Sequence, residues 1–224
     1  MLIDDYVAEL RTALSGPGGP RRDMVVEARD SLVDTADAFE DEGMSRAEAE
    51  ALAVREFGAV AEIAPGYQRE LMACAGRRLG ALLFVSVPAT ALAWSLLWKV
   101  FPADPSWWYG APAWTTVASR ALDYAQLAIA LCSGVALLAL GRGARLLGRA
   151  RLVTRTLGVL VLISVGLTGA LGFSLSTLAA APISIWSYVP GAVLTVVTYV
   201  LCGLQSYGAV RCLRITRTGI TRTA

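Results

Sequence analysis

The chain has 224 residues, of which 55% are hydrophobic and only 17% are charged, whereas a soluble domain of this size carries about a quarter of its residues as charges. It contains no histidine, which removes the commonest general base and metal ligand together with any Ser-His-Asp or Cys-His arrangement. The sequence also has no Gly-rich phosphate loop and no paired carboxylates inside its apolar stretches. We therefore expect no enzyme, no cofactor and no bound metal.

The charges are divided unevenly along the chain. Residues 1–76 hold 16 of the 18 acidic and 7 of the 20 basic residues, a net charge of −9. Residues 77–224 hold 13 basic and two acidic residues, a net charge of +11. This asymmetry indicates two modules in different surroundings, with a boundary near Gly76. We predict an acidic helical domain over 1–76, a four-helix transmembrane domain over 77–210 and a basic tail over 211–224.

The first predicted helix covers residues 2–14. Its apolar residues recur every three or four positions, which marks one buried face, and they are Ile3, Tyr6, Val7, Leu10 and Leu14. Residues 15–20 combine three glycines with two prolines and end this helix.

The second predicted helix begins near Pro20 and ends at about Glu42, before Gly43. Its apolar stripe lies opposite six carboxylates with the same spacing: Asp23, Glu27, Asp30, Asp34, Asp37 and Asp41. A straight helix does not supply the clustered oxygen ligands that calcium requires. The row is therefore either a solvated face, a docking face for a basic partner, or a surface that packs on the chain's own arginines.

The third predicted helix opens with Ser45 and Glu48, whose spacing is that of a capping box, and it ends at Gly58. Leu52, Ala53 and Phe57 are its predicted inner face. A fourth helix begins near Val60 and continues towards the membrane. Three or four short helices, each with one apolar face, form a compact bundle.

Four apolar stretches follow, each close to the roughly 20 residues that cross a bilayer as a helix. They cover about residues 79–100, 122–140, 156–179 and 191–210. Pro88 is expected to kink the first stretch without ending it. The predicted fold class is therefore all-α, a small cytoplasmic helical bundle followed by a four-helix transmembrane bundle. Acidic residues near the N-terminus, where a signal peptide carries positive charge, predict that the first span acts as an uncleaved anchor.

The connecting segments predict the orientation. Basic residues stand before the first span, between the second and third spans and after the fourth span, whereas the links 101–119 and 180–190 contain none. Basic segments stay on the cytoplasmic side, so we expect a multi-pass protein of the plasma membrane with both termini in the cytoplasm. Tryptophans and tyrosines in the two external links suit anchoring at the lipid headgroups, and a ligand-binding aromatic cluster is the alternative.

Three ionisable residues lie at the outer ends of the first two spans: Lys99, Arg120 and Asp123. We interpret them as an ion pair at the membrane interface, since Arg120 and Asp123 are three residues apart on one helix. A role for Asp123 in transport or proton relay is the alternative. Small residues in the third span, including Gly158, Gly166 and Ala170, suit close packing within the chain as well as a homo-oligomer.

The run from Gly43 to Gly58, GMSRAEAEALAVREFG, and the VAEI at residues 60–63 resemble the signature of HAAS signalling domains, also known as permease-prefix domains. The likeness covers roughly residues 2–72. It implies a cytoplasmic module ahead of membrane helices, of a type associated with PadR-like winged-helix regulators and frequent in actinobacteria.

The resemblance therefore implies an integral membrane signalling protein whose first domain contacts a PadR-like transcription regulator, with no direct binding of nucleic acid by this chain. A small permease or transporter accessory subunit with a regulatory prefix domain is the alternative. Altered transport in an Asp123→Asn or Lys99→Ala variant would favour that alternative. The sequence leaves open the stimulus, the partner and the oligomeric state.

Overall fold

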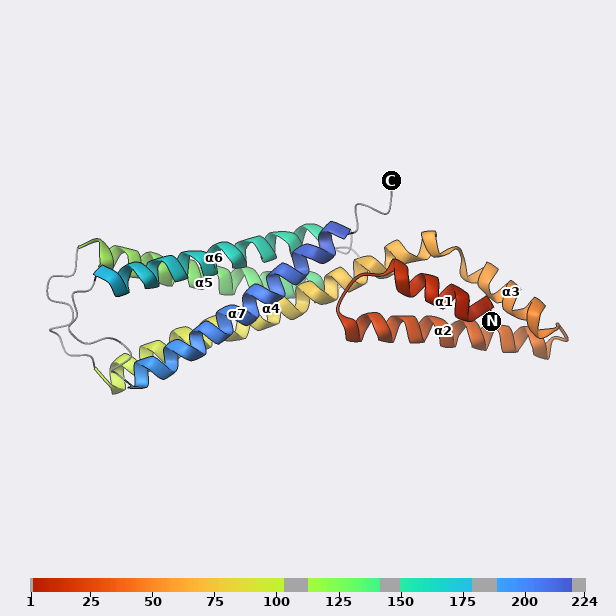
Figure 1. The fold of residues 1–224 in the computed structure, drawn as a ribbon, viewed down its shortest axis with the longest axis horizontal. Helices are drawn as coiled ribbons and strands as arrows, with labels where there is room; N and C mark the ends of the chain where they lie inside the picture. Colours follow the sequence, from red (N-terminus) through yellow and green to blue (C-terminus); the bar gives the residue numbers. More distant parts are fainter. Residues whose placement is uncertain (1, 103–112, 142–149, 179–188, 219–224) are drawn as a thin grey trace. The chain divides into compact units, whose positions relative to one another are not determined.

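A computed structural model describes residues 2–102, 113–141, 150–178 and 189–218. All secondary structure in these residues is helical, which confirms the predicted all-α fold. The helices are α1 (Leu2–Ala13), α2 (Gly18–Asp41), α3 (Arg46–Phe57), α4 (Val60–Val100), α5 (Trp114–Gly141), α6 (Ala150–Leu178) and α7 (Val189–Thr218) (Figure 1).

Helices α1, α2 and α3 pack against one another around one apolar core. Every apolar residue predicted for the first helix belongs to it, with Val7 at its edge and the other four buried. Helix α2 contributes Val25, Ala28, Leu32 and Ala36, whose spacing of three or four residues places them on one side of the helix. Ring contact between Tyr6 and Phe57 joins α1 to the end of α3.

The ends of α3 follow the predicted signals. Glu48 accepts hydrogen bonds from both the backbone N–H and the hydroxyl of Ser45, at 3.2 and 2.7 Å, and these bonds hold the pKa of Glu48 below its ordinary value. Gly58 ends the helix at φ +99°, a conformation that favours glycine, and its carbonyl accepts a hydrogen bond from the Tyr6 hydroxyl at 2.8 Å.

The predicted inner face of α3 was partly wrong. Ala49 and Ala53 are its buried residues, with Val54 and Phe57 packed beside them, whereas Leu52 is only half-buried and does not belong to the core. Alanines at the contact let α3 approach α1 and α2 closely, so the larger Leu52 lies at the flank.

The predicted fourth helix and the first membrane span form one continuous helix, α4, of 41 residues. Neither Pro65, the sixth residue of this helix, nor Pro88 ends it. The other three spans are likewise parts of longer helices. Trp114, placed in an external link by the sequence, is instead the first residue of α5.

The described residues contain four helices that are long and apolar enough to cross a membrane, so the chain is a multi-pass membrane protein. The chain also divides into two compact units. Among the described residues, the first contains 2–75, 150–154 and 214–218, and the second contains 76–102, 113–141, 155–178 and 189–213. Helix α4 contributes residues to both.

Within the second unit, successive membrane helices run in opposite directions. Gly80 lies against Leu137, and Gly134 lies against Phe84, so α4 and α5 are antiparallel. The contacts of Leu79 with Gly208 and of Ser86 with Gln205 show the same relation for α4 and α7. Gly158, near the start of α6, lies against Leu213, near the end of α7. One end of this unit therefore carries Arg77, Arg155 and Arg211, and we call it the basic end.

At the basic end, a hydrogen bond from a charged side chain joins α4 to α5. The Arg77 guanidinium donates to the carbonyl of Leu140 at 3.1 Å, in the last turn of α5. Carbonyls at a helix C-terminus lack partners within the helix, and a cation near them is stabilising. Arg77 thereby holds the start of one span beside the end of the next.

Candidate partner-binding surface

The six predicted carboxylates are all exposed side chains of α2. Burial of the apolar stripe of α2 in the core of the first unit turns the opposite side of the helix to the solvent. At about 100° per residue the six side chains fall within a narrow sector of α2. The structure therefore brings the six carboxylates together on one surface. Their contacts differ, however.

Asp37 is exposed, but its carboxylate is engaged in an ion-pair network. The Arg46 guanidinium contacts the carboxylates of Asp37, Glu40 and Glu50. Hydrogen bonds to Asp37, then to Glu40 and Glu50, raise the pKa of Arg46 above its ordinary value. Because these groups are exposed, the network contributes little to stability, but it fixes the end of α2 beside the start of α3.

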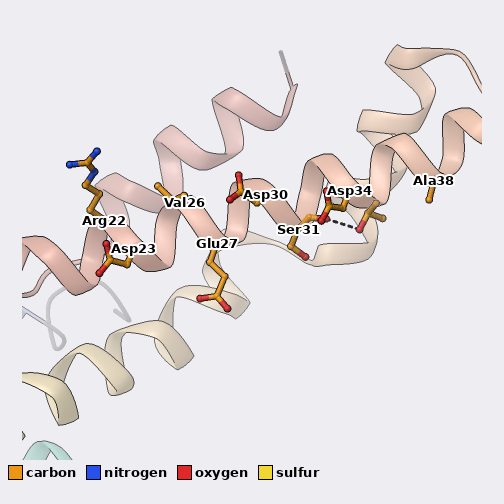
Figure 2. A pocket seen from close by; sticks show the side chains of 9 residues that line it. Arg22, Asp23, Val26, Glu27, Asp30, Ser31, Asp34 and Ala38 are labelled. Carbon is orange, nitrogen blue, oxygen red and sulfur yellow. Dashed lines mark hydrogen bonds between the residues drawn. The ribbon is translucent and has the colours of Figure 1, made fainter.

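Four of the six carboxylates, Asp23, Glu27, Asp30 and Asp34, line a shallow trough along α2, and we call these four residues the acidic face. Figure 2 shows their side chains following one another along the helix. In the part of the chain that the structure describes, no hydrogen bond or ion pair is recorded for any of the four. Among the described residues, their charges therefore make no ion pair that would stabilise the first unit.

The trough is lined by other side chains besides the four carboxylates. Val26 is 46% exposed, and Ala38 and Arg22 line the trough as well. All lining residues come from α2, so the trough is an open surface and not an enclosed cavity. Such a surface, with an apolar residue among mostly acidic ones, suits a protein partner better than a small molecule, which prefers a concave and largely apolar pocket.

The pKa of Tyr67, a residue of α4, is affected by one member of the acidic face. Burial, followed by the negative charges of Glu27 and Glu70, raises the pKa of Tyr67. Tyr67 packs against the core of the first unit.

The three predicted interface charges, Lys99, Arg120 and Asp123, are all exposed, on α4 and α5. Among the described residues the structure records no ion pair between any two of them. The ion pair at the membrane interface stays a prediction.

Sequence reasoning missed two side-chain hydrogen bonds that join α4 to α7. The Gln205 amide donates to the Ser86 hydroxyl at 2.9 Å, and the Trp94 indole donates to the Thr198 hydroxyl at 3.2 Å. Ser86 and Gln205 are both buried. The polar residues were visible in the apolar stretches, and the seven-residue spacing of Thr198 and Gln205 puts both on one side of α7.

We predict that Ser86 and Gln205 are energetically coupled. In a double-mutant cycle of Ser86→Ala and Gln205→Leu, the coupling is expected to be about 0.5–2 kcal/mol, because each single change leaves the other polar group without its partner in an apolar interior. Unfolding of the full chain in detergent measures it. Ser119→Ala removes an exposed hydroxyl that bonds only within α5, at Thr116, and should have no effect. Additive effects of the two changes would contradict the prediction.

Comparison with protein-family models, with curated proteins and with solved structures gives no match. The HAAS-like signature therefore stays an expectation that rests on residues 43–63. The case for a function depends on the geometry of the acidic face.

Proposed function

We propose that the chain is a membrane signalling protein whose first domain binds a PadR-like transcription regulator through the acidic face of α2. The observation that carries the proposal is that four exposed carboxylates share one side of a helix and take part in no ion pair in the described residues. Like charges placed close together repel one another, and a basic partner relieves this repulsion. The HAAS-like signature supplies the class of partner.

The proposal places both termini in the cytoplasm. It is supported by the basic residues at one end of the membrane helices, since basic segments remain on the cytoplasmic side. The antiparallel order of α4 to α7 puts the beginning of the first span and the end of the last one at this same end. A regulator in the cytoplasm is then within reach of the first domain.

The test is a binding titration of the full chain in lipid nanodiscs against the purified PadR-like regulator encoded nearest to its gene. Asp30→Asn combined with Asp34→Asn is expected to weaken binding about tenfold or more, because two complementary charges are removed from the interface. Raising the salt concentration should weaken the binding of the unchanged protein more than that of this variant.

The matched control is Asp5→Asn combined with Glu56→Gln. Both residues are exposed, and this pair changes the net charge equally while lying on α1 and α3. The control should bind as the unchanged protein does. Equal weakening in both variants would reduce the effect to net charge, and no binding by the unchanged protein would refute the proposed partner.

A further inference from the structure

One turn of α4 in the first unit is buried around most of its circumference. Leu71, Met72, Ala73 and Ala75 are 0%, 5%, 3% and 6% exposed. Successive residues of a helix point about 100° apart, so these four buried residues, with the half-buried Cys74 between them, require contacts around most of the circumference. Elsewhere in the first unit the described part of α4 has a single further buried residue, Val60. Other elements must therefore surround α4 at this turn.

The first of these elements is the linker between α1 and α2. The Gln68 side chain accepts a hydrogen bond from the Ser15 backbone N–H at 2.9 Å and donates one to the Ser15 carbonyl at 2.7 Å. A Cβ atom at Gly16 would lie 3.1 Å from that of Leu71, so any larger residue at this position would force Leu71 to shift. Residues 15 and 16 are thereby held on α4 just before α2 begins at Gly18.

The second element is the start of α6. Thr154 is fully buried, and its hydroxyl donates to the carbonyl of Met72 at 3.2 Å. Ile215 and Thr216 at the end of α7 are buried in the same unit. Gln68 and Met72 are four residues apart and therefore stand on one side of α4. The contacts to the linker and to α6 thus meet within a single helical turn.

From this arrangement we infer that the turn of α4 from Gln68 to Met72 is a coupling device that links the start of α6 to the linker ahead of α2. A displacement of Thr154 shifts the carbonyl of Met72 and, with it, the side chain of Gln68 that holds Ser15. Because α2 starts two residues beyond Gly16, the device controls how firmly the helix that bears the acidic face is held. Only this last step rests on the proposed function.

The inference is tested by backbone amide exchange of the full chain in nanodiscs, without any partner. Gln68→Leu should raise exchange at Ser15 about fivefold, because it removes the acceptor of that amide. Thr154→Val keeps the shape of the side chain and removes its hydroxyl. It should raise exchange at Ser15 at least about twofold, although Thr154 does not contact Ser15. By reciprocity, Gln68→Leu should raise exchange at residues 152–154.

Two controls distinguish coupling from a local packing role. Thr154→Ser keeps the hydroxyl and should behave as the unchanged chain does. If Thr154→Val does not fold, the effect of Gln68→Leu on exchange at residues 152–154 still tests the coupling. Thr195→Val removes a hydroxyl that bonds only within α7 and should leave Ser15 unaffected. If Thr154→Val raised exchange only around residues 72–76 and 152–158, the coupling would be refuted. The proposed function would stand, because binding at the acidic face is measured separately.

Discussion

Leu32→Ala should lower the free energy of unfolding of the first domain by about 2–5 kcal/mol. Leu32 is 0% exposed and lies in the middle of α2, between the buried residues Ala28 and Ala36. Its loss leaves a cavity, since the alanines on either side are too small to fill the space. A domain of this size has a total stability of roughly 4–11 kcal/mol, so the substitution removes a large part of it.

Limited proteolysis of the full chain in nanodiscs measures this loss. Cleavage within residues 1–75 should accelerate roughly thirtyfold or more, because a protease cuts the opened state in proportion to its population. Val26→Ala is the control on the same helix, where the side chain is 46% exposed, and it should change cleavage little. Similar cleavage of both variants would mean that Leu32 is not central to the core.

The pattern of apolar residues was sufficient to predict most of the fold. In α1 the spacing of Ile3, Tyr6 and Leu10 identified the buried side correctly, because a helix has only one side that can face a small core. The capping box at Ser45 and the glycine at position 58 identified both ends of α3, since these signals act within a few residues. Local chemistry determines such features, and the sequence contains all of it.

The errors arose where contacts distant in sequence decide the outcome. Leu52 has the right spacing for the inner face of α3, but Ala49 is buried instead, beside the correctly predicted Ala53. By contrast, the continuation of the fourth helix towards the membrane was predicted, and α4 runs into the first span without a break. Residues 72–78 are helix formers and small residues, and nothing in them ends a helix.

The candidate surface was predicted only in outline. The six carboxylates were identified as one row, but Asp37 is engaged by Arg46, which belongs to the next helix. The bonds from Gln205 to Ser86 and from Gln68 to Ser15 were not predictable, because each depends on the register of two helices or on the path of a linker. Periodicity indicates which side of a helix is buried and does not indicate which residue lies opposite.

Glycines of the third span show the same limit, because their spacing suited packing within the chain and dimerisation equally well. In the structure these glycines have different surroundings. A Cβ atom at Gly158 would lie 3.2 Å from Leu213 Cγ and 3.3 Å from the carbonyl of Ala209, whereas Gly166 and Gly169 have no atom within 4 Å of that position. Gly158 therefore lies in the contact of α6 with α7, and the other two face outward.

Gly158→Leu is accordingly expected to destabilise the membrane bundle by about 1–3 kcal/mol or more. The added side chain meets backbone as well as Leu213, so α6 and α7 must move apart, and closely approaching backbones are the main source of attraction between membrane helices. Thermal unfolding of the full chain in detergent provides the measurement, with a lower midpoint for this variant.

Gly169→Leu is the matched control, because it makes the same chemical change on the same helix at a position open to lipid. Its unfolding midpoint should be unchanged or slightly raised, since leucine favours both the helical state and the bilayer. If Gly169→Leu were as damaging as Gly158→Leu, the outward face of α6 would have to be covered in the membrane. A second copy of the chain would then be the first candidate, and cross-linking of single cysteines on that face would test it. Damage at Gly158 alone means that Gly158 serves packing within one chain and that the outward face of α6 at Gly169 meets lipid.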